Sequence, residues 1–353
     1  MKKYEIAVVP GDGIGKEVIP GATKVLDHVA SMGGFRLSYR NFDYSCEYYV
    51  KKGRMMPEDG LDRLREHDAI FLGAVGFPGV PDHISLWGLL IPIRRQFQQY
   101  INLRPVKLLK GVSSPLKNPG DIDFYIVREN NEGEYSSIGG KLYEGTQDEM
   151  VIQESVFTRK GVDRVLKFAF ELAQSRKGHL TSATKSNGII HTMPFWDERF
   201  QTMGRAFPKV ETDQYHIDIL TAHFVQHPDR FDVVVASNLF GDILSDLGPA
   251  VVGGMGLAAG ANINPEKEYP SMFEPVHGSA PDIARKGIAN PIASCWTGAM
   301  MLEQLGEKEA AAQILYAIEA VTEESKILTP DLGGAASTSD VIRAIISKLN
   351  TLQ

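Results

Sequence analysis

Short apolar runs and longer segments with helical spacing alternate along most of the chain. Segments typical of strands cover residues 6–9 and 35–42, and the apolar runs over residues 69–72 and 124–127 have the length of buried strands. An amphipathic stretch over residues 18–29 has the spacing of a helix, and so does the stretch over residues 87–100 despite Pro92. This alternation predicts an α/β protein in which helices cover a mainly parallel sheet.

The same pattern continues in the second half of the chain and predicts where functional groups lie. Predicted strands over residues 179–184, 212–217 and 232–236 each end in a polar cluster that precedes a helical pattern. Because strand ends carry the binding groups of α/β proteins, we expect the chemistry there. The glycine-rich residues 253–270 predict a connection between domains or a long functional loop, and final helices follow over residues 292–349.

Length and charge narrow the class of protein. A chain of 353 residues with 43% hydrophobic content is long enough for two globular domains. A net charge of -7 without a long basic block argues against nucleic acid as a partner, so local cations must bind any anionic substrate. The N-terminal apolar run breaks at Pro10, too early for a signal peptide or a membrane span, which predicts a cytoplasmic protein without a membrane partner. Cys46 and Cys295 lack a pairing motif and are interpreted as ordinary buried or half-buried thiols.

The first motif is Gly11-Asp12-Gly13-Ile14-Gly15, between a predicted strand and a predicted helix. Its spacing is GxGxG, whereas the classical Rossmann fingerprint is GxGxxG with an acidic residue at the end of the second strand. The motif therefore predicts a tight strand-to-helix turn without a classical Rossmann fingerprint.

Three arginines stand near predicted strand or helix ends: Arg94 in IRRQF, Arg104 in NLRPV and Arg128 in VREN. A guanidinium group binds a carboxylate through two parallel hydrogen bonds, so three that converge would hold a dicarboxylate. Taken singly, each also fits a surface residue, and Arg95 beside Arg94 is interpreted as one.

An acidic pair follows the apolar strand over residues 232–236. Asp242 and Asp246 are four residues apart and share one face of a predicted helix. Neighbouring carboxylates repel unless a cation lies between them, and oxygen ligands favour Mg²⁺ or Mn²⁺ over zinc. A solvated helix face is an equal alternative at this point. Asp218, after His216 and Ile217, is a plausible third ligand.

Together these segments resemble the β-decarboxylating dehydrogenases, the family of isocitrate, isopropylmalate, homoisocitrate and tartrate/D-malate dehydrogenases. The resemblance spans nearly the whole chain and is specific because six motifs occur in order. They are PGDGIG (10–15), NLRP (102–105), VRENNEGEYS (127–136), ATKSN (183–187), SNLFGDILSD (237–246) and FEPVHGSAPDIA (273–284).

The resemblance implies a two-domain fold around one shared twisted sheet. The large, cofactor-binding domain would be discontinuous, built from residues 1–100 and 255–353. Residues 101–254 would form a smaller domain for substrate, metal and dimerisation. It also implies a homodimer in which Lys185 and Asp218 enter the active site of the neighbouring chain.

The resemblance further implies roles for individual residues. Arg94, Arg104 and Arg128 would bind the substrate carboxylates, Lys185 would be the general base, and Tyr135 would reprotonate the product carbon. The metal, Mn²⁺ or Mg²⁺, would be held by Asp242 and Asp246 and by Asp218 of the other chain. The family also leaves room for a monovalent cation such as K⁺.

The implied cofactor is NAD, bound in this family without a glycine fingerprint. Asp282 would accept hydrogen bonds from the adenosine ribose and repel a 2′-phosphate, whereas NADP-dependent relatives have Lys and Tyr at the positions of Asp282 and Ile283. Arg285 departs from the Gly of close relatives and leaves some use of NADP open. The cofactor site implied by the resemblance consists of Glu274, His277, Gly278, Ser279, Ala280, Asp282, Ile283 and Asn290.

The segment HISLWG, from His83 to Gly88, resembles the branch that acts on tartrate or D-malate. Trp87 and Leu90, with Arg94 on the same helix, would line the pocket wall that faces the substrate's C3 group and leave room only for a small substrate. The implied reaction is oxidation and oxidative decarboxylation of a small 2-hydroxy dicarboxylate. The alternatives are a 3-isopropylmalate dehydrogenase and a catalytically silent regulatory subunit that binds dicarboxylate and nucleotide.

Overall fold

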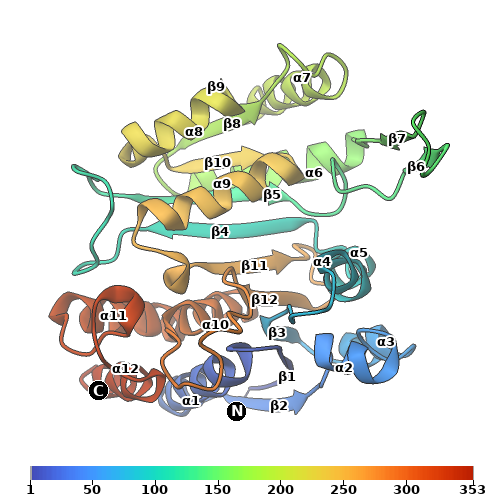
Figure 1. The fold of residues 1–353 in the computed structure, drawn as a ribbon. Helices are drawn as coiled ribbons and strands as arrows, with labels where there is room; N and C mark the ends of the chain where they lie inside the picture. The colour runs from blue at the N-terminus through green and yellow to red at the C-terminus, as the bar shows by residue number, and fades with distance from the viewer. Residues whose placement is uncertain (1, 353) are drawn as a thin grey trace.

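The computed structural model describes residues 2–352 and is built on one ten-stranded sheet (Figure 1). The strand order is β2-β1-β3-β12-β11-β4-β5-β10-β8-β9. These strands are β1 (Lys3–Gly11), β2 (Arg36–Asn41), β3 (Ala69–Ala74), β4 (Ile101–Lys107), β5 (Asp123–Glu129), β8 (His179–Thr184), β9 (Glu211–His216), β10 (Val233–Ala236), β11 (Ala259–Ile263) and β12 (Ser271–Pro275).

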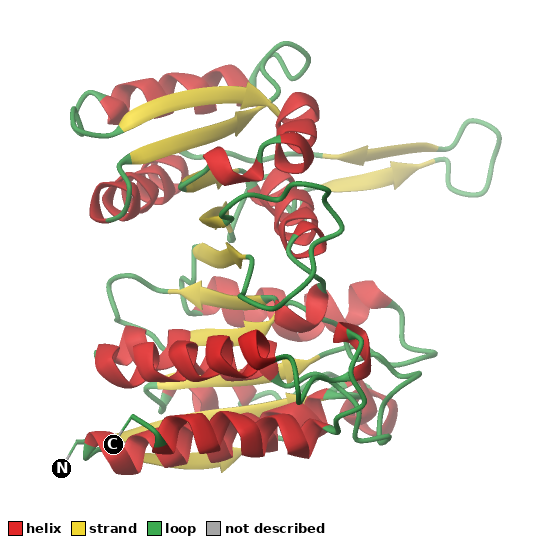
Figure 2. Ribbon diagram, turned by 90° about the vertical axis from the view of Figure 1, so that its left-hand side faces the viewer, coloured by secondary structure: helices red, strands yellow, loops and turns green. Residues whose placement is uncertain are grey.

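Helices cover both faces of this sheet, as Figure 2 shows. They are α1 (Gly15–Gly33), α2 (Cys46–Lys52), α3 (Gly60–Arg65), α4 (Asp82–Ser85), α5 (Ile91–Gln96), α6 (Arg159–Ser175), α7 (Thr192–Gly204), α8 (Ile217–Gln226), α9 (Asn238–Val251), α10 (Ile292–Leu305), α11 (Lys308–Glu324) and α12 (Thr338–Asn350). Short 3-10 turns lie at Pro228–Arg230, Met255–Leu257 and Pro330–Leu332.

The middle of the sheet differs from its two ends. Strands β12, β11, β4 and β5 pair antiparallel, whereas β2-β1-β3-β12 and β5-β10-β8-β9 are parallel series. The five strands from β2 to β11 come from the N-terminal and C-terminal thirds of the chain, and the five from β4 to β9 come from its middle. The β11–β4 pair therefore joins the half of the sheet built from the two ends of the chain to the half built from its middle.

Side-chain alternation along each strand divides the core between the two faces of the sheet. On β10, Val233 and Val235 pack with α6 residues such as Phe170, whereas Val234 and Ala236 pack with α8 and α9. In the other half, α1 and α10 to α12 cover one face, and helices α2, α3 and α5 help to cover the other. The predicted two-domain α/β fold with one shared sheet is confirmed, and Cys46 and Cys295 are both buried as predicted.

Most predicted elements agree with the structure, but residues 253–270 do not form a long irregular loop. They contain β11, a strand whose residues are all buried in the middle of the sheet. Its sequence, AGANI, has small side chains and no apolar and polar alternation, because both faces are covered. The connection between the domains is therefore part of the sheet itself.

The predicted helix over residues 87–100 is also different. A π-helical turn (Leu86–Leu90) precedes α5, which ends at Gln96. The backbone N–H of Ile91 donates to the carbonyl of Leu86, the five-residue spacing of a π-turn. This bond places Leu86 and Ile91 about one turn apart on the same side of the segment.

The Gly11-Asp12-Gly13-Ile14-Gly15 segment is the predicted tight turn between β1 and α1. Gly11 and Gly13 have φ of 71° and 51°, and a Cβ on Gly13 would lie 1.9 Å from the carbonyl oxygen of Ser279. The buried Asp12 carboxylate accepts from the backbone N–H of Cys46 at 2.9 Å and of Gly76 at 3.2 Å. At the carboxyl end of β1, the turn thus contacts the start of α2, the segment after β3 and the loop around Ser279.

A separate hairpin projects from the body of the protein (Figure 2). Its strands are β6 (Gly139–Leu142) and β7 (Met150–Gln153), and every residue of both strands is exposed. Apolar side chains on it include Leu142, Val151 and Ile152. Across residues 2–352, we find no helix of the length and hydropathy needed to cross a membrane.

Candidate active site

Strand register brings several predicted residues to one face of the central strands. Asn102 on β4 pairs with Arg128 on β5, and on its other side with Asn262 on β11. Residues paired in a sheet point to the same face, and so does Arg104, two residues after Asn102. Gly260 pairs with Glu274 of β12 and adds that carboxylate to the same face.

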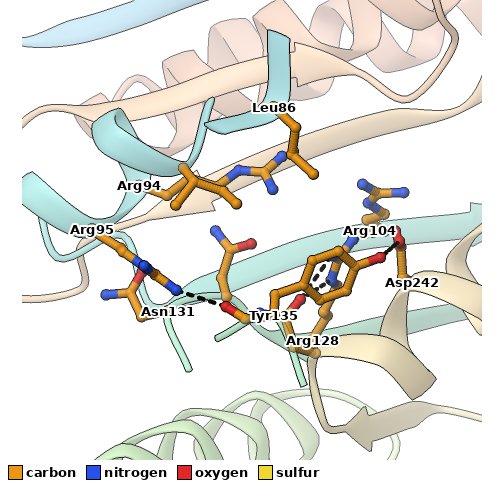
Figure 3. Close-up of a pocket in the computed structure, with 11 residues that line it drawn as sticks. Leu86, Arg94, Arg95, Arg104, Arg128, Asn131, Tyr135 and Asp242 are labelled. Carbon is orange, nitrogen blue, oxygen red and sulfur yellow. Dashed lines mark hydrogen bonds and ion pairs between the residues drawn. The ribbon is translucent and has the colours of Figure 1, made fainter. Parts of the chain in front are cut away.

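A pocket of about 130 Å³ opens on this face (Figure 3). Arg94 from α5 and Arg104 and Arg128 from the sheet converge on it, so the predicted convergence of the arginines is present. The remaining lining residues are Leu86, Ile91, Arg95, Asn130, Asn131, Tyr135, Asn238 and Asp242. All three predicted arginines are buried, which suits the binding of anionic groups inside the protein.

The arginines are held by partners rather than left unpaired. Arg94 donates to Glu274 at 2.9 Å, and Arg104 donates to Ser245 at 2.8 Å and approaches Asp246 at 3.6 Å. Burial and the charge of Arg128 lower the pKa of Arg104 to about 10, so this guanidinium stays charged at neutral pH. The pocket therefore presents fixed positive charge.

Asp242 and Tyr135 lie together at the mouth of the pocket. The Tyr135 hydroxyl donates to Asp242 at 2.6 Å, and Arg128 also pairs with this carboxylate. Burial, the hydrogen bond and the charge of Asp242 raise the pKa of Tyr135 to about 12. Burial alone would raise the pKa of Asp242, but Arg128 and Tyr135 hold it below its usual range. Tyr135 is thus a protonated donor beside a carboxylate at neutral pH.

The N-terminus of α9 is positioned by the segment that carries Tyr135. The Glu134 carboxylate accepts from the Ser237 hydroxyl at 2.7 Å and from the Leu239 N–H at 3.0 Å. A Cβ on Gly241 would lie 2.6 Å from the Cβ of Arg128, so glycine allows α9 to approach β5 closely. Both contacts fix Asp242 against Arg128 and Tyr135.

The carboxylates of α9 suit a cation, but the third predicted ligand lies elsewhere in the chain. Burial is the main cause of the raised pKa of Asp246; Asp242 adds to it, while Arg104 opposes it. Among residues 2–352, no group of three His, Cys, Asp or Glu side chains is arranged to hold a metal ion. Asp218 lies in the first turn of α8 and pairs with Lys185 at 2.9 Å, with 68% of its side chain exposed.

The two residues predicted to form the substrate wall, Trp87 and Leu90, do not line this pocket. Leu86 and Ile91 line the pocket instead, because the π-turn changes which side chains face it. Leu90 packs on the core around α5, and the half-exposed Trp87 ring lies 5.1 Å from the Arg95 guanidinium. Arg95, predicted as a surface residue, lines the pocket and donates to the carbonyl of Tyr135 at 2.6 Å.

The predicted cofactor loop lies against the glycine turn. Ser279 accepts from the N–H of Ile14 at 2.8 Å, and Asn290 donates to Asp331 at 2.9 Å. A cavity of about 530 Å³ lies between the loop and the turn, lined by Gly13, Lys16, Glu17, Glu47, Gly76, Phe77, Pro78, Pro281, Ala284 and Arg285. Burial lowers the pKa of His277, while Gly278 and Asp282 are exposed and Ala280 and Ile283 are half-buried. Glu274, predicted for the same site, instead pairs with Arg94.

Several pocket residues were missed by the reasoning from sequence. Asn130, Asn131 and Asn238 all belong to the motifs VRENNEGEYS and SNLFGDILSD and follow directly on β5 or β10. Their position after a strand was a usable signal. Leu86 and Ile91 had no comparable signal, because a π-turn does not follow from hydrophobic spacing.

Comparisons with known proteins agree with this geometry. The family model described as isocitrate/isopropylmalate dehydrogenase matches residues 5–345. The chain is 59% identical to D-malate dehydrogenase [decarboxylating] of Escherichia coli (strain K12), with 98% of each chain covered. It is 55% identical to tartrate dehydrogenase/decarboxylase of Pseudomonas putida, with 99% of this chain and 98% of the relative covered.

Solved structures of two dehydrogenases have a similar fold over nearly the whole chain. Isocitrate dehydrogenase from Methylococcus capsulatus has a TM-score of 0.89 and 34% identity, with 98% of this chain and 99% of that one covered. A beta-decarboxylating dehydrogenase from Thermococcus kodakarensis has a TM-score of 0.80 and 35% identity, with 99% and 97% covered.

Proposed function

Because this chain belongs to the isocitrate/isopropylmalate dehydrogenase family, we propose that it oxidises and decarboxylates a small 2-hydroxy dicarboxylate, D-malate or tartrate, with NAD and Mn²⁺ or Mg²⁺. The observation that carries this proposal is the pocket in which Arg94, Arg104 and Arg128 converge beside Tyr135 and Asp242. Three buried guanidinium groups match the two carboxylates of such a substrate. The names of the two relatives above support the choice of substrate.

Each part of the pocket has a proposed task. The arginines bind and orient the carboxylates, and Tyr135 keeps its proton at neutral pH and delivers it to the carbon that loses carbon dioxide. Asp242 and Asp246 would hold the divalent cation, which when bound supplies a Lewis acid for the 2-hydroxyl and the adjacent carboxylate. Lys185 is the proposed general base, and the cavity beside the loop 277–283 is the proposed NAD site.

The position of Lys185 and Asp218 supports a homodimer with shared active sites. The pair does not line the pocket of its own chain, and Asp218 is largely exposed. Exposed apolar side chains lie nearby on α8 and α9, among them Ile219, Val225 and Ile243. The sheet also supports the proposed domains, residues 1–100 with 255–353 and residues 101–254, because β11 and β4 meet at that division.

One observation favours a second candidate substrate, 3-isopropylmalate. Leu86 and Ile91 form an apolar wall that an isopropyl group could contact. The polar Arg95 and Asn131 on the same pocket favour the smaller substrates instead.

A panel of 2-hydroxy acids tests the proposal. NAD reduction and carbon dioxide release should occur with D-malate or a tartrate isomer, and 3-isopropylmalate should be used less well. Excess chelator should abolish turnover and added Mn²⁺ or Mg²⁺ should restore it, because the α9 carboxylates then lack their cation. Full turnover in chelator would exclude the metal role, and no turnover with any acid would favour the silent subunit.

A further inference from the structure

A row of buried amides lies beneath the arginine pocket and centres on Asn262. Asn262 is on β11, directly opposite Asn102 of β4, and both side chains are completely buried. Asn262 does not line the pocket. Its influence on a ligand therefore has to pass through the residues that it holds.

The Asn262 side chain links two of the pocket arginines by an unbroken series of hydrogen bonds. Its amide nitrogen donates to Glu274 at 2.7 Å, and the same carboxylate oxygen accepts from Arg94 at 2.9 Å. Its amide oxygen accepts from Asn102 at 2.9 Å, and the oxygen of Asn102 accepts from Arg104 at 2.7 Å. Arg94 and Arg104 are thus connected through the Glu274 carboxylate and the amides of Asn262 and Asn102.

A further hydrogen bond links Asn262 to Asn130, another residue that lines the pocket. Asn130 donates to the Asn262 oxygen at 2.9 Å, and its nitrogen is also 2.9 Å from the carbonyl of Gln99. Asn130 lines the pocket two residues after Arg128. The oxygen of Asn262 therefore accepts from two amides while its nitrogen donates to a carboxylate.

Asn262 lies at the junction between the two halves of the sheet. Arg94 and Glu274 belong to the half of the sheet that contains β11 and β12, whereas Arg104 lies on β4 in the other half. Asn262 and Asn102 face each other across the junction of the two halves. The distance between two carboxylate-binding groups from different halves thus depends on this contact.

We propose that Asn262 is a positioning residue that holds Arg94 and Arg104 at the spacing required by the two carboxylates of the substrate. This proposal rests on the proposed function, because the ligand in question is the dicarboxylate substrate named there. Only a group that both donates and accepts fits here, because a buried donor or acceptor left without a partner is costly.

An aspartate at this position provides a sharp test because its protonated form has nearly the shape of asparagine and keeps one donor for Glu274 and one acceptor for Asn102, losing only the longer bond to the Met272 carbonyl at 3.4 Å. The charged groups that face the site are Glu274 on β12, Arg94 on α5 and Arg104 on β4. At low pH the new carboxyl keeps its proton and donates to Glu274 as the amide does. At higher pH it loses this proton and places a second negative charge beside Glu274, which disturbs the pairing with Arg94.

The experiment compares Asn262→Asp and Asn262→Leu with a matched control, Asn264→Asp. Asn264 is also buried and lies just after β11, but it bonds to Gln98, Glu266, Glu268 and Tyr269 rather than to the arginine series. D-malate binding is measured by calorimetry without NAD, and KM and kcat are measured with NAD. Both sets of measurements are made at about pH 5.5 and about pH 8.5, on either side of the titration expected for a buried carboxyl.

Asn262→Leu should raise the dissociation constant and KM for D-malate about 10-fold at both pH values, with a smaller change in kcat. Asn262→Asp should bind D-malate almost like the unmodified protein at the lower pH and about 10-fold more weakly at the higher pH. Asn264→Asp should not show this pH-dependent ratio. A folded Asn262→Leu protein with unchanged D-malate binding, or an Asn262→Asp ratio that does not change with pH, would overturn the proposal.

The melting temperature separates this proposal from the proposed function. The new carboxyl has a raised pKa in the folded state, so the deficit in melting temperature of Asn262→Asp should grow as the pH rises. If the unmodified protein neither binds nor oxidises any acid of the panel, the proposed function fails. The melting comparison then still tests the hydrogen bonds from Asn262 to Glu274, and a deficit that is the same at both pH values would contradict them.

Discussion

The arginine pocket and the Lys185–Asp218 pair differ in how completely one chain builds them. In the pocket, residues from α5, β4, β5 and α9 converge, and the arginines are buried and paired. Lys185 and Asp218 lie farther along the sheet, where Lys185 follows β8 and Asp218 lies in the first turn of α8, and the two side chains form an ion pair. One chain thus builds the whole arginine pocket, whereas the proposed base and third metal ligand lie outside it and Asp218 is largely exposed.

We infer from this contrast that binding and proton transfer can depend on separate surfaces of the protein. Substrate affinity should follow the buried arginines, whereas the rate of the chemical step should follow a side chain delivered from outside the pocket. Substitutions in the two regions should therefore change different kinetic constants.

The largest effect is expected for Lys185→Met. Removal of the proposed base should lower kcat by at least about 100-fold, whereas the dissociation constant of D-malate should change by less than about twofold. Steady-state kinetics and calorimetry measure the two quantities. Lys167→Met is a matched control because Lys167 is an exposed lysine on α6. Normal turnover in Lys185→Met would remove this residue from the mechanism.

Hybrid dimers test whether the two regions act across chains. The Lys185→Met and Tyr135→Phe proteins should each be nearly inactive. When their subunits are exchanged under mild denaturation, the mixture should regain about a quarter of normal activity. In each hybrid dimer one site then contains both an intact general acid and an intact general base. The expected fraction follows because half of the dimers are hybrids and each contains one intact site of two. A mixture no more active than its components would show that each chain uses its own Lys185.

A smaller effect is expected at the apolar wall of the pocket. Leu86→Ala should shift the ratio of kcat/KM for 3-isopropylmalate over D-malate upward by about 10-fold, because it enlarges the space beside the substrate. Trp87→Ala should change this ratio less, since the Trp87 ring lies against Arg95 instead of lining the pocket. A larger shift with Trp87→Ala than with Leu86→Ala would restore the wall predicted from sequence.

Sequence patterns predicted the parts of the molecule that depend on local spacing. The strands that contain Val127 and Val235 and the long helix α1 follow from apolar periodicity, and the convergence of Arg94, Arg104 and Arg128 follows from the family motifs. Strand β11 was missed because its small side chains are buried on both faces and show no alternation. Arg95 was misjudged because its partner, the carbonyl of Tyr135, is 40 residues away in the sequence.

The π-turn before α5 has a consequence for how new substrate preferences evolve. A π-turn contains one more residue than the α-turn that it replaces, and each residue of an α-helix rotates its neighbours by about 100°. Loss of a single codon among those for residues 86–90 would return the segment to α spacing and turn a different set of side chains toward the pocket. Arg104 and Arg128 lie on the sheet and would be unaffected. Such a deletion would replace the side chains of the apolar wall in one mutation, while the two arginines on the sheet keep their positions.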